Sequence, residues 1–364
     1  MTRTRKSHVT RQKSQRPGCG AIWDLSLVTC ALTTVVVVSL SPVQAQVPQS
    51  RPAWAWQPSI PSVPAGEVEI VPVRGKVYML VGAGANITVH AGDDEVLLVD
   101  AGVESMSDTV LAALRRISTR PLRYIVNTTG REAHTGGNER LAAAGSTIPF
   151  RVATDPRVSD GRLGQDRASV VSYLTVFHRM SAPTGQQAPR PEAAWPDNTY
   201  STPQKKLFIN EEPVIIAHFP STTDGTSIVH FRTSDVVSVG DLVDLTGYPM
   251  IDVKAGGSLD AVVESLNRLI DLTVPGRRSE GGTLVVPGHG RLADQPDIAY
   301  YREMATIVRD RIKAMIGKGM TVEQVKAARP TRDFDMRYGR TTGPWTTDMF
   351  VEAAYASMKP AGSR

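Results

Sequence analysis

Short apolar segments separated by glycine-rich turns follow one another from about residue 66 onward. Val77–Val81, Asn86–His90 and Val96–Asp100 are runs of β-branched and apolar residues of this kind, and they predict strands. The period then changes to that of a helix, with apolar residues at Met106, Val110, Leu111, Leu114 and Ile117. A further strand is expected at Tyr124–Val126, and the order strand, helix, strand indicates an α/β fold.

The middle of the chain has a looser pattern. We expect a helix at Leu141–Ala144 and interpret Phe150–Lys205 as an insertion near the functional site, with one helix at Ala168–Met180. Regular apolar runs then return and predict four more strands, at Val214–His218, Ser227–Phe231, Val236–Val239 and Thr283–Val286.

Helical patterns dominate the C-terminal part. Leu259–Leu272 carries an apolar stripe that predicts a helix packed against the core. Beyond Leu292 we expect three further helices, at Ala299–Ile316, Thr321–Ala328 and Asp348–Met358.

The N-terminus has the layout of a secretory signal peptide. Six basic residues among the first sixteen precede the apolar stretch Leu25–Leu40 and a small-residue cleavage site after Ala45. Because a transmembrane helix needs roughly 20 apolar residues, we expect export and cleavage rather than a retained anchor. The predicted location is periplasmic or secreted, with no membrane association after cleavage, and residues 46–65 form an extended lead-in to the folded part.

Cleavage changes the charge of the chain. Of its 41 basic and 36 acidic residues, six and one lie in the leader, which leaves 35 of each. A near-neutral mature protein gives no reason to expect a nucleic-acid partner. Cys19 and Cys30 also lie in the leader, so any metal in the mature protein must be held by His, Asp or Glu. The oligomeric state is not indicated by the sequence.

The segment between Asn127 and Asn138 is the most informative part of the chain. It reads Asn-Thr-Thr-Gly-Arg-Glu-Ala-His-Thr-Gly-Gly-Asn. It follows a predicted strand, as do Leu97–Gly102, Phe219–Gly225 and Gly240–Asp241, and Pro287–Gly290 ends the last predicted strand. The order, spacing and strand-end placement of these segments together form a specific pattern.

These segments, in this order, resemble the metallo-β-lactamase superfamily. Asn127–Asn138 has the frame of its zinc loop, Asn-Thr-His-x-His-x-Asp-His-x-Gly-Gly-Asn, and the likeness extends over about residues 68 to 292. It implies an αββα metallo-β-lactamase sandwich at 66–295, with a helical C-terminal extension at 296–364 packed on it.

The resemblance also assigns the metal ligands residue by residue. The three histidines of the first metal site correspond to Thr129, Arg131 and Thr222, so that site is lost. The four ligands of the second site correspond, in order, to Ala133, His134, Asp241 and His289. Three of these four are ligand types, and Asp100 corresponds to the aspartate that braces the loop.

His134, Asp241 and His289 are chemically sufficient for one zinc ion, because a catalytic zinc site needs three protein ligands and an open position. The same set of two histidines and a carboxylate also suits Fe(II). With Ala133 in place of a carboxylate, Glu132 and Asp224 are the remaining candidates for a catalytic base beside Asp241.

Two functions stay open at this point. The first is an exported hydrolase with a single-metal site that acts on a small ester, lactone, thioester or amide. The second is a non-catalytic binding protein on the same fold, in which the Arg131 guanidinium pairs with Asp241 and replaces the charge of the missing metal. A small-molecule substrate or ligand is expected in either case, and Tyr200, Trp195 and Tyr248 are candidates for the walls of its pocket.

Overall fold

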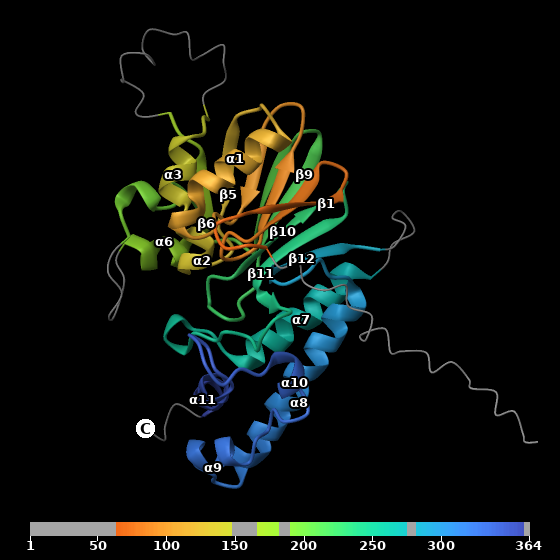
Figure 1. The fold of residues 1–364 in the computed structure, drawn as a ribbon. Helices are drawn as coiled ribbons and strands as arrows, with labels where there is room; N and C mark the ends of the chain where they lie inside the picture. Colours follow the sequence, from red (N-terminus) through yellow and green to blue (C-terminus); the bar gives the residue numbers. More distant parts are fainter. Residues whose placement is uncertain (1–62, 148–165, 182–189, 275–281, 360–364) are drawn as a thin grey trace, which may run out of the picture. The chain divides into compact units, whose positions relative to one another are not determined.

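The computed structural model of the protein describes residues 63–147, 166–181, 190–274 and 282–359 (Figure 1). The predicted leader, its cleavage site after Ala45 and most of the lead-in at 46–65 lie outside these residues. Within the described ranges, no helix is both long enough and apolar enough to cross a membrane.

Two β-sheets form the centre of the fold (Figure 1). The first sheet has seven strands that pair in chain order, namely β1 (Glu69–Arg74), β2 (Val77–Val81), β3 (Ile87–Ala91), β4 (Val96–Val99), β5 (Leu122–Val126), β6 (Ser169–Tyr173) and β7 (Asn198–Tyr200). The second sheet has five strands in the order β12 (Leu284–His289), β11 (Val236–Asp244), β10 (Ser227–Phe231), β9 (Glu212–His218) and β8 (Gln204–Ile209). Strands β4 to β7 are parallel, as are β11 and β12, and the remaining pairs are antiparallel.

Alternate residues of a strand enter different hydrophobic clusters. On β4, Leu97 and Val99 pack between the two sheets, whereas Val96 and Leu98 face the outer helices. All four side chains are buried because both faces of this strand are covered. The sequence of such a strand is an unbroken run of apolar residues, as it is in β4.

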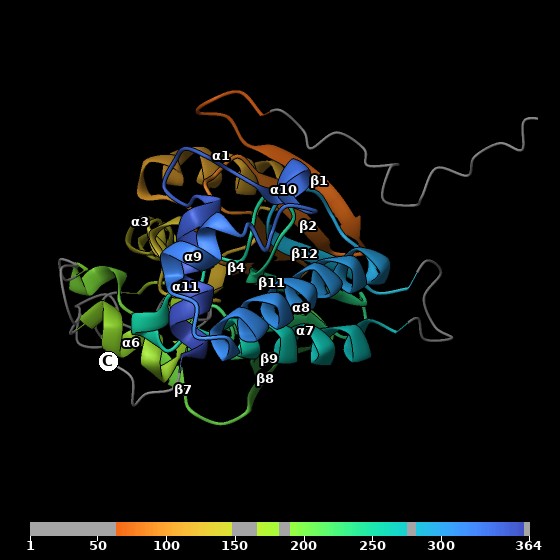
Figure 2. The same ribbon diagram turned by 90° about the horizontal axis from the view of Figure 1, so that it is seen from below.

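Helices cover the outer faces of both sheets (Figures 1 and 2). α1 (Ser107–Ile117) and α3 (Asn138–Ala143) pack on the first sheet, and α7 (Leu259–Thr273), α8 (Gln295–Gly317) and α11 (Thr347–Met358) share a hydrophobic cluster with the second. The other helical segments are η2 (Glu104–Met106), α2 (Glu132–Thr135), α6 (Leu174–Ser181), η3 (Glu192–Ala194), η4 (Val253–Ala255), α9 (Val322–Ala327) and α10 (Asp335–Tyr338). The layers helix, sheet, sheet, helix confirm the predicted αββα sandwich.

α8 begins earlier than its apolar pattern predicts. Asp294 accepts a hydrogen bond from the backbone N–H of Asp297 (3.1 Å), and the Asp297 carboxylate accepts one from the backbone of Asp294 (3.3 Å). This reciprocal cap satisfies backbone donors that a helix start leaves free. The helix therefore starts at Gln295 rather than at Ala299.

The predicted helix at Ala168–Met180 is wrong over its first half. Ser169–Tyr173 forms β6, which pairs with β5 and β7, and only Leu174–Ser181 is helical. The β-branched pair at Val170 and Val171 is buried beside β5, where pairing between strands outweighs a local apolar period. The described parts of Phe150–Lys205 thus supply β6 and β7 to the first sheet and the first residues of β8 to the second. The interpretation of this interval as an insertion near the functional site stays a prediction.

β11 and β12 reach further than predicted. β11 continues past Val239 to Asp244, and β12 continues through the Pro-Gly pair to His289. Asp241 therefore lies on a paired strand and His289 is the last residue of the neighbouring one, so the backbone of both is held by the second sheet.

Two glycines allow the close approach of chains at this place. Gly240 has a φ of +49°, and a Cβ added there would lie 2.2 Å from Oγ1 of Thr128. A Cβ added to Gly288 would lie 2.8 Å from the backbone of Gly240. Since real contacts of a Cβ are longer than this, only glycine fits at either position.

Glu212, on β9 of the second sheet, contacts His90 on β3 of the first sheet. Its buried carboxylate accepts hydrogen bonds from the backbone N–H groups of Thr233 (2.8 Å) and Ser234 (2.6 Å) and lies 3.0 Å from Nε2 of His90 on β3. Burial raises the pKa of Glu212, but the bonds from His90 and Ser234 outweigh burial and hold the pKa below its usual range.

We expect Glu212→Gln to lower the free energy of unfolding by about 2–3 kcal/mol at neutral pH, because the amide cannot accept all of these donors. A carboxylate whose pKa is lower in the folded state contributes stability above its unfolded pKa, and this contribution disappears as the pH falls through the folded pKa. The difference in unfolding free energy between wild type and variant should therefore become smaller as the pH falls. Urea unfolding at several pH values measures it, and Glu211→Gln, whose side chain is exposed, is the matched control. An equal loss in both variants would contradict the role of Glu212.

Candidate metal centre

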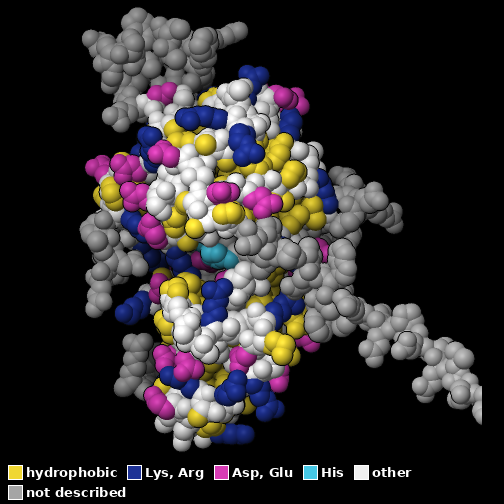
Figure 3. Space-filling view, in the orientation of Figure 1, with side chains coloured by type: hydrophobic (Ala, Val, Ile, Leu, Met, Phe, Trp, Pro, Cys, Tyr) yellow, Lys and Arg dark blue, Asp and Glu magenta, His cyan; other side chains and the backbone are white. Residues whose placement is uncertain are grey.

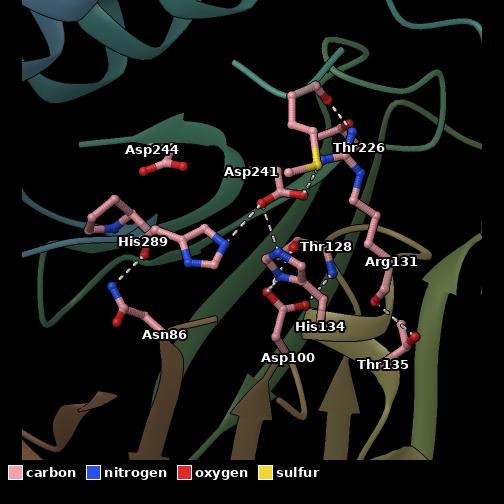
Figure 4. Close-up of polar contacts among 12 residues, drawn as sticks. Asn86, Asp100, Thr128, Arg131, His134, Thr135, Thr226, Asp241, Asp244 and His289 are labelled. Atoms are coloured by element: carbon pink, nitrogen blue, oxygen red, sulfur yellow. Dashed lines mark hydrogen bonds and ion pairs between the residues drawn. The ribbon is translucent and has the colours of Figure 1, made fainter. Parts of the chain in front are cut away.

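The structure brings the three predicted ligands together. His134 comes from α2, Asp241 from β11 and His289 from the end of β12, and one ligand atom of each lies within 4.8 Å of the others. Oδ1 of Asp241 is 2.8 Å from Nε2 of His134 and 3.8 Å from Nε2 of His289. Figure 4 shows Asp241 between the two imidazole rings.

Asp100 holds His134 in place from the other side. The residue directly follows β4 and has a φ of +67°, a left-handed conformation that aspartate tolerates better than most residues. Its Oδ2 lies 2.7 Å from Nδ1 of His134, and its carboxylate accepts bonds from the backbone N–H and the hydroxyl of Thr128, each at 2.8 Å. A carboxylate on Nδ1 leaves Nε2 directed at the ligand position, which is the arrangement found around histidines that bind metals.

His134 is fully buried between two carboxylates. Burial lowers its pKa, but the charges of Asp241 and Asp100 outweigh burial and raise the pKa to about 10. Burial likewise raises the pKa of Asp241, but His134 and Arg131 hold this pKa far below its usual range. The two carboxylates thus favour a proton on His134, and a metal at Nε2 would have to displace that proton.

Arg131 contacts the other oxygen of Asp241. Its guanidinium lies 3.2 Å from Oδ2, and it also donates a hydrogen bond to the backbone carbonyl of Met250. The predicted ion pair between Arg131 and Asp241 is therefore present. Oδ2 therefore faces the guanidinium, and Oδ1 faces the two histidines.

The donor set fits a zinc ion. Two imidazole nitrogens and one carboxylate oxygen are ligands that zinc prefers, and three such ligands leave a position open. The three atoms already converge within 4.8 Å, and Asp100 orients the first histidine. Nε2 of His134 and Oδ1 of Asp241 are 2.8 Å apart, which is a hydrogen-bond distance.

Three asparagine side chains fix the surrounding loops, and the sequence analysis did not assign a role to Asn86 among them. Asn86 donates to the carbonyls of Pro287 (3.0 Å) and Gly290 (2.9 Å), one on each side of His289. Asn127 and Asn138 bond to each other at both ends of the zinc-loop frame, at 3.0 and 2.8 Å. The position of Asn86, at the start of a strand far away in sequence, carries no local signal of this role.

Two of the three positions that correspond to ligands of the first metal site are buried in the protein. Thr129 and Thr222 are fully buried, and among the described residues their hydroxyls have no hydrogen-bond partner. Unlike a histidine, a threonine offers no ring nitrogen to a metal ion. Of the three first-site positions, only Arg131 supplies a charge to the centre.

Glu132 and Asp224 lie in other ion pairs. The carboxylate of Glu132 is paired with Arg190, and that of Asp224 accepts from Arg179 (2.6 Å) and from the hydroxyl of Thr175 (2.8 Å). In the described part of the chain, no recorded contact joins either carboxylate to the three metal-ligand candidates. Their role as a base stays a prediction.

A small cavity adjoins the centre. It has a volume of about 170 Å³ and is lined by His289, by Tyr248 and Met250 from the segment after β11, and by residues of the C-terminal part. Tyr248 is thus a pocket residue, as its aromatic character suggested. Figure 3 shows a histidine surface in the hollow between the sheets and the C-terminal helices, with charges of both signs around it.

A larger hollow of about 930 Å³ lies elsewhere. Asp235 and Thr283, which line it, precede β11 and β12, so it is at the opposite ends of these strands. It contains none of the three converging ligands. Because chemistry needs convergent polar groups as well as space, we place the functional site at the smaller cavity.

Two solved structures of one sulfatase share the fold at low identity. The stereoselective inverting sec-alkylsulfatase Pisa1 from Pseudomonas sp. is 13% identical, with a TM-score of 0.56 over 81% of this chain and 51% of that chain. A double mutant of the same sulfatase gives 12% and 0.55 over the same shares. A metallo-beta-lactamase from Pontibacter korlensis is 15% identical, with a TM-score of 0.47 over 66% of this chain and 99% of its own. The chain spans about half the length of the sulfatase.

No curated protein matches the chain. The family model of the metallo-beta-lactamase superfamily matches residues 81–289, a range that begins at the end of β2 and ends at His289. It includes Asp100, His134 and Asp241, the strands β3 to β7 of the first sheet and all five strands of the second. The match extends over more than half of the sequence, and the chain belongs to the metallo-beta-lactamase superfamily.

Proposed function

We propose that the protein is an exported hydrolase of the metallo-β-lactamase fold with one metal ion, held by His134, Asp241 and His289. The observation that carries this proposal is the convergence of the three ligand atoms within 4.8 Å, with Asp100 on the far nitrogen of His134. Zinc is the metal that this donor set suits best, and Fe(II) is the second.

His134, Asp241 and His289 would hold the zinc ion, and the chemistry it would supply when bound is a water molecule of lowered pKa and polarisation of a carbonyl oxygen. The residues of the chain prepare the position. Asp100 orients His134, Asn86 fixes the loop that carries His289, and Arg131 neutralises the oxygen of Asp241 that faces away from the histidines. Burial of His134 and Asp241 lowers the local dielectric and strengthens these interactions.

The substrate class proposed is a small ester, lactone, thioester or amide. This class is an analogy from hydrolases of the family, because a fold by itself does not determine a reaction. Glu132 and Asp224 are kept as candidate bases. Each would have to leave its arginine partner, Arg190 or Arg179, to accept a proton from water.

We expect the mature protein to contain about one equivalent of zinc or iron after purification without chelator and loading with either metal. Elemental mass spectrometry measures the content. His134→Ala and His289→Ala should each abolish it, since two remaining ligands bind weakly.

His178→Ala is the matched control, because this exposed histidine on α6 belongs to no ligand set. It should keep the full metal content. Absence of metal in the loaded wild type would sink the hydrolase proposal and leave the second candidate.

The second candidate is a non-catalytic binding protein on the same fold. The observation that favours it is the ion pair of Arg131 with Asp241. Arg131 and a protonated His134, whose pKa the two carboxylates raise, would balance the charges of Asp100 and Asp241 without a metal. A buried carboxylate requires such a partner.

Arg131→Met separates the two candidates. The variant keeps the length of the side chain and removes its charge, so in chelator we expect a loss of about 2–4 kcal/mol of unfolding free energy. If the hydrolase proposal holds, zinc binds the native state and returns part of this loss. If the protein binds no metal, urea unfolding curves with zinc and with chelator will coincide.

Arg190→Met is the control for this comparison. Its ion pair with Glu132 is about one third to one half exposed, so its removal should cost no more than about 1 kcal/mol. A loss as large as that of Arg131→Met would show that any arginine deletion destabilises the chain and would remove the special role of Arg131.

Export is proposed from the leader alone. If the predicted signal peptide is used, the mature chain begins at Gln46, and intact mass spectrometry of the protein from the periplasm or medium will give that mass. Recovery of the complete chain from the cytoplasm would contradict the proposal.

A further inference from the structure

Two charged side chains from distant parts of the chain border the cavity beside His289. Asp244 is the last residue of β11, Arg340 follows α10, and both line this cavity together with His289. Asp244 is also the register partner of His289 in the sheet, and Figure 4 shows its carboxylate beside His289. A group bound at Asp244 therefore lies next to a ligand of the proposed metal.

One oxygen of Asp244 is held and the other is free. Oδ1 accepts hydrogen bonds from the backbone N–H and the hydroxyl of Thr246, both at 2.7 Å. Oδ2 accepts no bond from the described residues, yet it is not one of the buried polar atoms that lack a partner, so it opens to solvent in the cavity. The carboxylate is thus fixed in direction and still has an acceptor atom to offer.

The guanidinium of Arg340 is held in a similar way. Its Nη2 donates to the hydroxyl (3.0 Å) and to the carbonyl (3.2 Å) of Thr246. Nε and Nη1 donate to no described residue, and no carboxylate of the described ranges forms an ion pair with this exposed side chain. Thr246 therefore positions both charged groups and leaves donors on one of them and an acceptor on the other unoccupied.

The free atoms of both groups face the space next to Gly247. A Cβ added to Gly247 would lie 3.5 Å from Oδ2 of Asp244 and 3.9 Å from Nε of Arg340, and its three nearest atoms all belong to these two side chains. Among the described residues the two charges meet only through Thr246 and not in a direct ion pair. A ligand at this point can therefore contact both charges at once.

A ligand with an ammonium and a carboxylate on the same carbon atom matches this arrangement. Oδ2 of Asp244 accepts from the ammonium, and the free N–H groups of Arg340 donate to the carboxylate. A simple anion or cation uses only one of the two groups, whereas a zwitterion makes charge-assisted hydrogen bonds to both, and these are stronger than bonds between neutral groups.

The remaining lining limits the size of the ligand. The cavity measures about 170 Å³, and Tyr248, Met250 and Pro344 are among its apolar walls. A cavity of about 150 Å³ holds one benzene molecule in a known case. The present cavity therefore accommodates an amino acid group with the first atoms of its side chain, and His289 is on its border.

We propose that this cavity binds an α-amino acid group of the substrate, with the ammonium at Oδ2 of Asp244 and the carboxylate at Arg340. The proposal rests on the function proposed above, since it specifies the substrate of the same site. Because both α-groups are then used for binding, the ester, thioester or amide that is hydrolysed belongs to the side chain of this amino acid.

L-Alanine is the probe, because it carries both charges on one carbon and has no hydrolysable bond. The titration uses the mature protein in chelator, since amino acids and carboxylates also bind zinc. We expect ligand-observed NMR to give a Kd of about 1–10 mM. Propionate and ethylammonium, which each lack one of the two charged groups, should bind at least about tenfold more weakly. Equal or tighter binding of either ion, or no binding of L-alanine, would overturn the proposal.

Variants then test the two contacts separately. Asp244→Asn keeps an oxygen for Thr246 and removes the charge, and Arg340→Gln removes the guanidinium; each should weaken L-alanine binding at least about fivefold. In Asp244→Asn the affinity for propionate should not fall, because the carboxylate contact at Arg340 remains. Asp333→Asn and Arg311→Gln are the matched controls, since these residues form an ion pair (2.6 Å) and do not line the cavity. Unchanged L-alanine affinity in both cavity variants would refute the assignment.

Gly247→Ala tests the space between the two charges without a change of charge. The added methyl group makes contacts of ordinary length, so the unfolding midpoint should stay within about 2 °C of the wild type. The methyl group occupies the place of the ligand, and L-alanine binding should weaken at least about tenfold. Full affinity in a folded Gly247→Ala would place the amino acid elsewhere and contradict the proposal.

A last comparison separates this proposal from the one on the metal. The titration is repeated with His134→Ala, whose metal site is incomplete. Binding of L-alanine to this variant supports the cavity site whatever the metal analysis finds. A wild type that holds one equivalent of zinc but does not bind L-alanine in chelator would refute the amino acid site and leave the hydrolase proposal intact.

Discussion

The buried carboxylate of Asp241 is the constraint on which the rest of the centre depends. A charge removed from water must be compensated at close range, and here three residues share that task, with His134 and His289 toward one oxygen and Arg131 toward the other. The carboxylate of Asp100 in turn lies against the other ring nitrogen of His134, and the hydroxyl of Thr128 donates a hydrogen bond to Asp100. The glycine at 240 is required because any side chain there would occupy the position of the Thr128 hydroxyl. One charge thus explains the identity of several residues around it.

The centre differs from an intact two-metal site in how its charge is distributed. Thr129 and Thr222 carry no charge, and Arg131 is a permanent cation that cannot leave by deprotonation. Because this cation lies beside Asp241, the carboxylate has a charged partner whether or not a metal is bound.

The sequence predicts those features whose signals are local or ordered along the chain. His134, Asp241 and His289 each lie near the end of a strand in the order typical of the superfamily, and the structure places them together. The strand at Ser169–Tyr173 was missed because its apolar residues also fit a helix, and pairing with β5 and β7 decides between the two. Tyr338 comes near His289 only through the packing of the C-terminal helices on the second sheet, for which no local pattern exists. The same holds for Asn86, whose partners lie some 200 residues further along the chain.

The origin of the ligands has a consequence for folding kinetics. Asp100 and His134 follow strands of the first sheet, whereas Asp241 and His289 belong to the second, so the centre exists only after the two sheets have docked. Contacts between residues so distant in sequence form late, because closing long loops is slow. When the two sheets separate during unfolding, the contact between His134 and Asp241 should therefore break. The environment of His134 thus reports whether the two sheets are packed together.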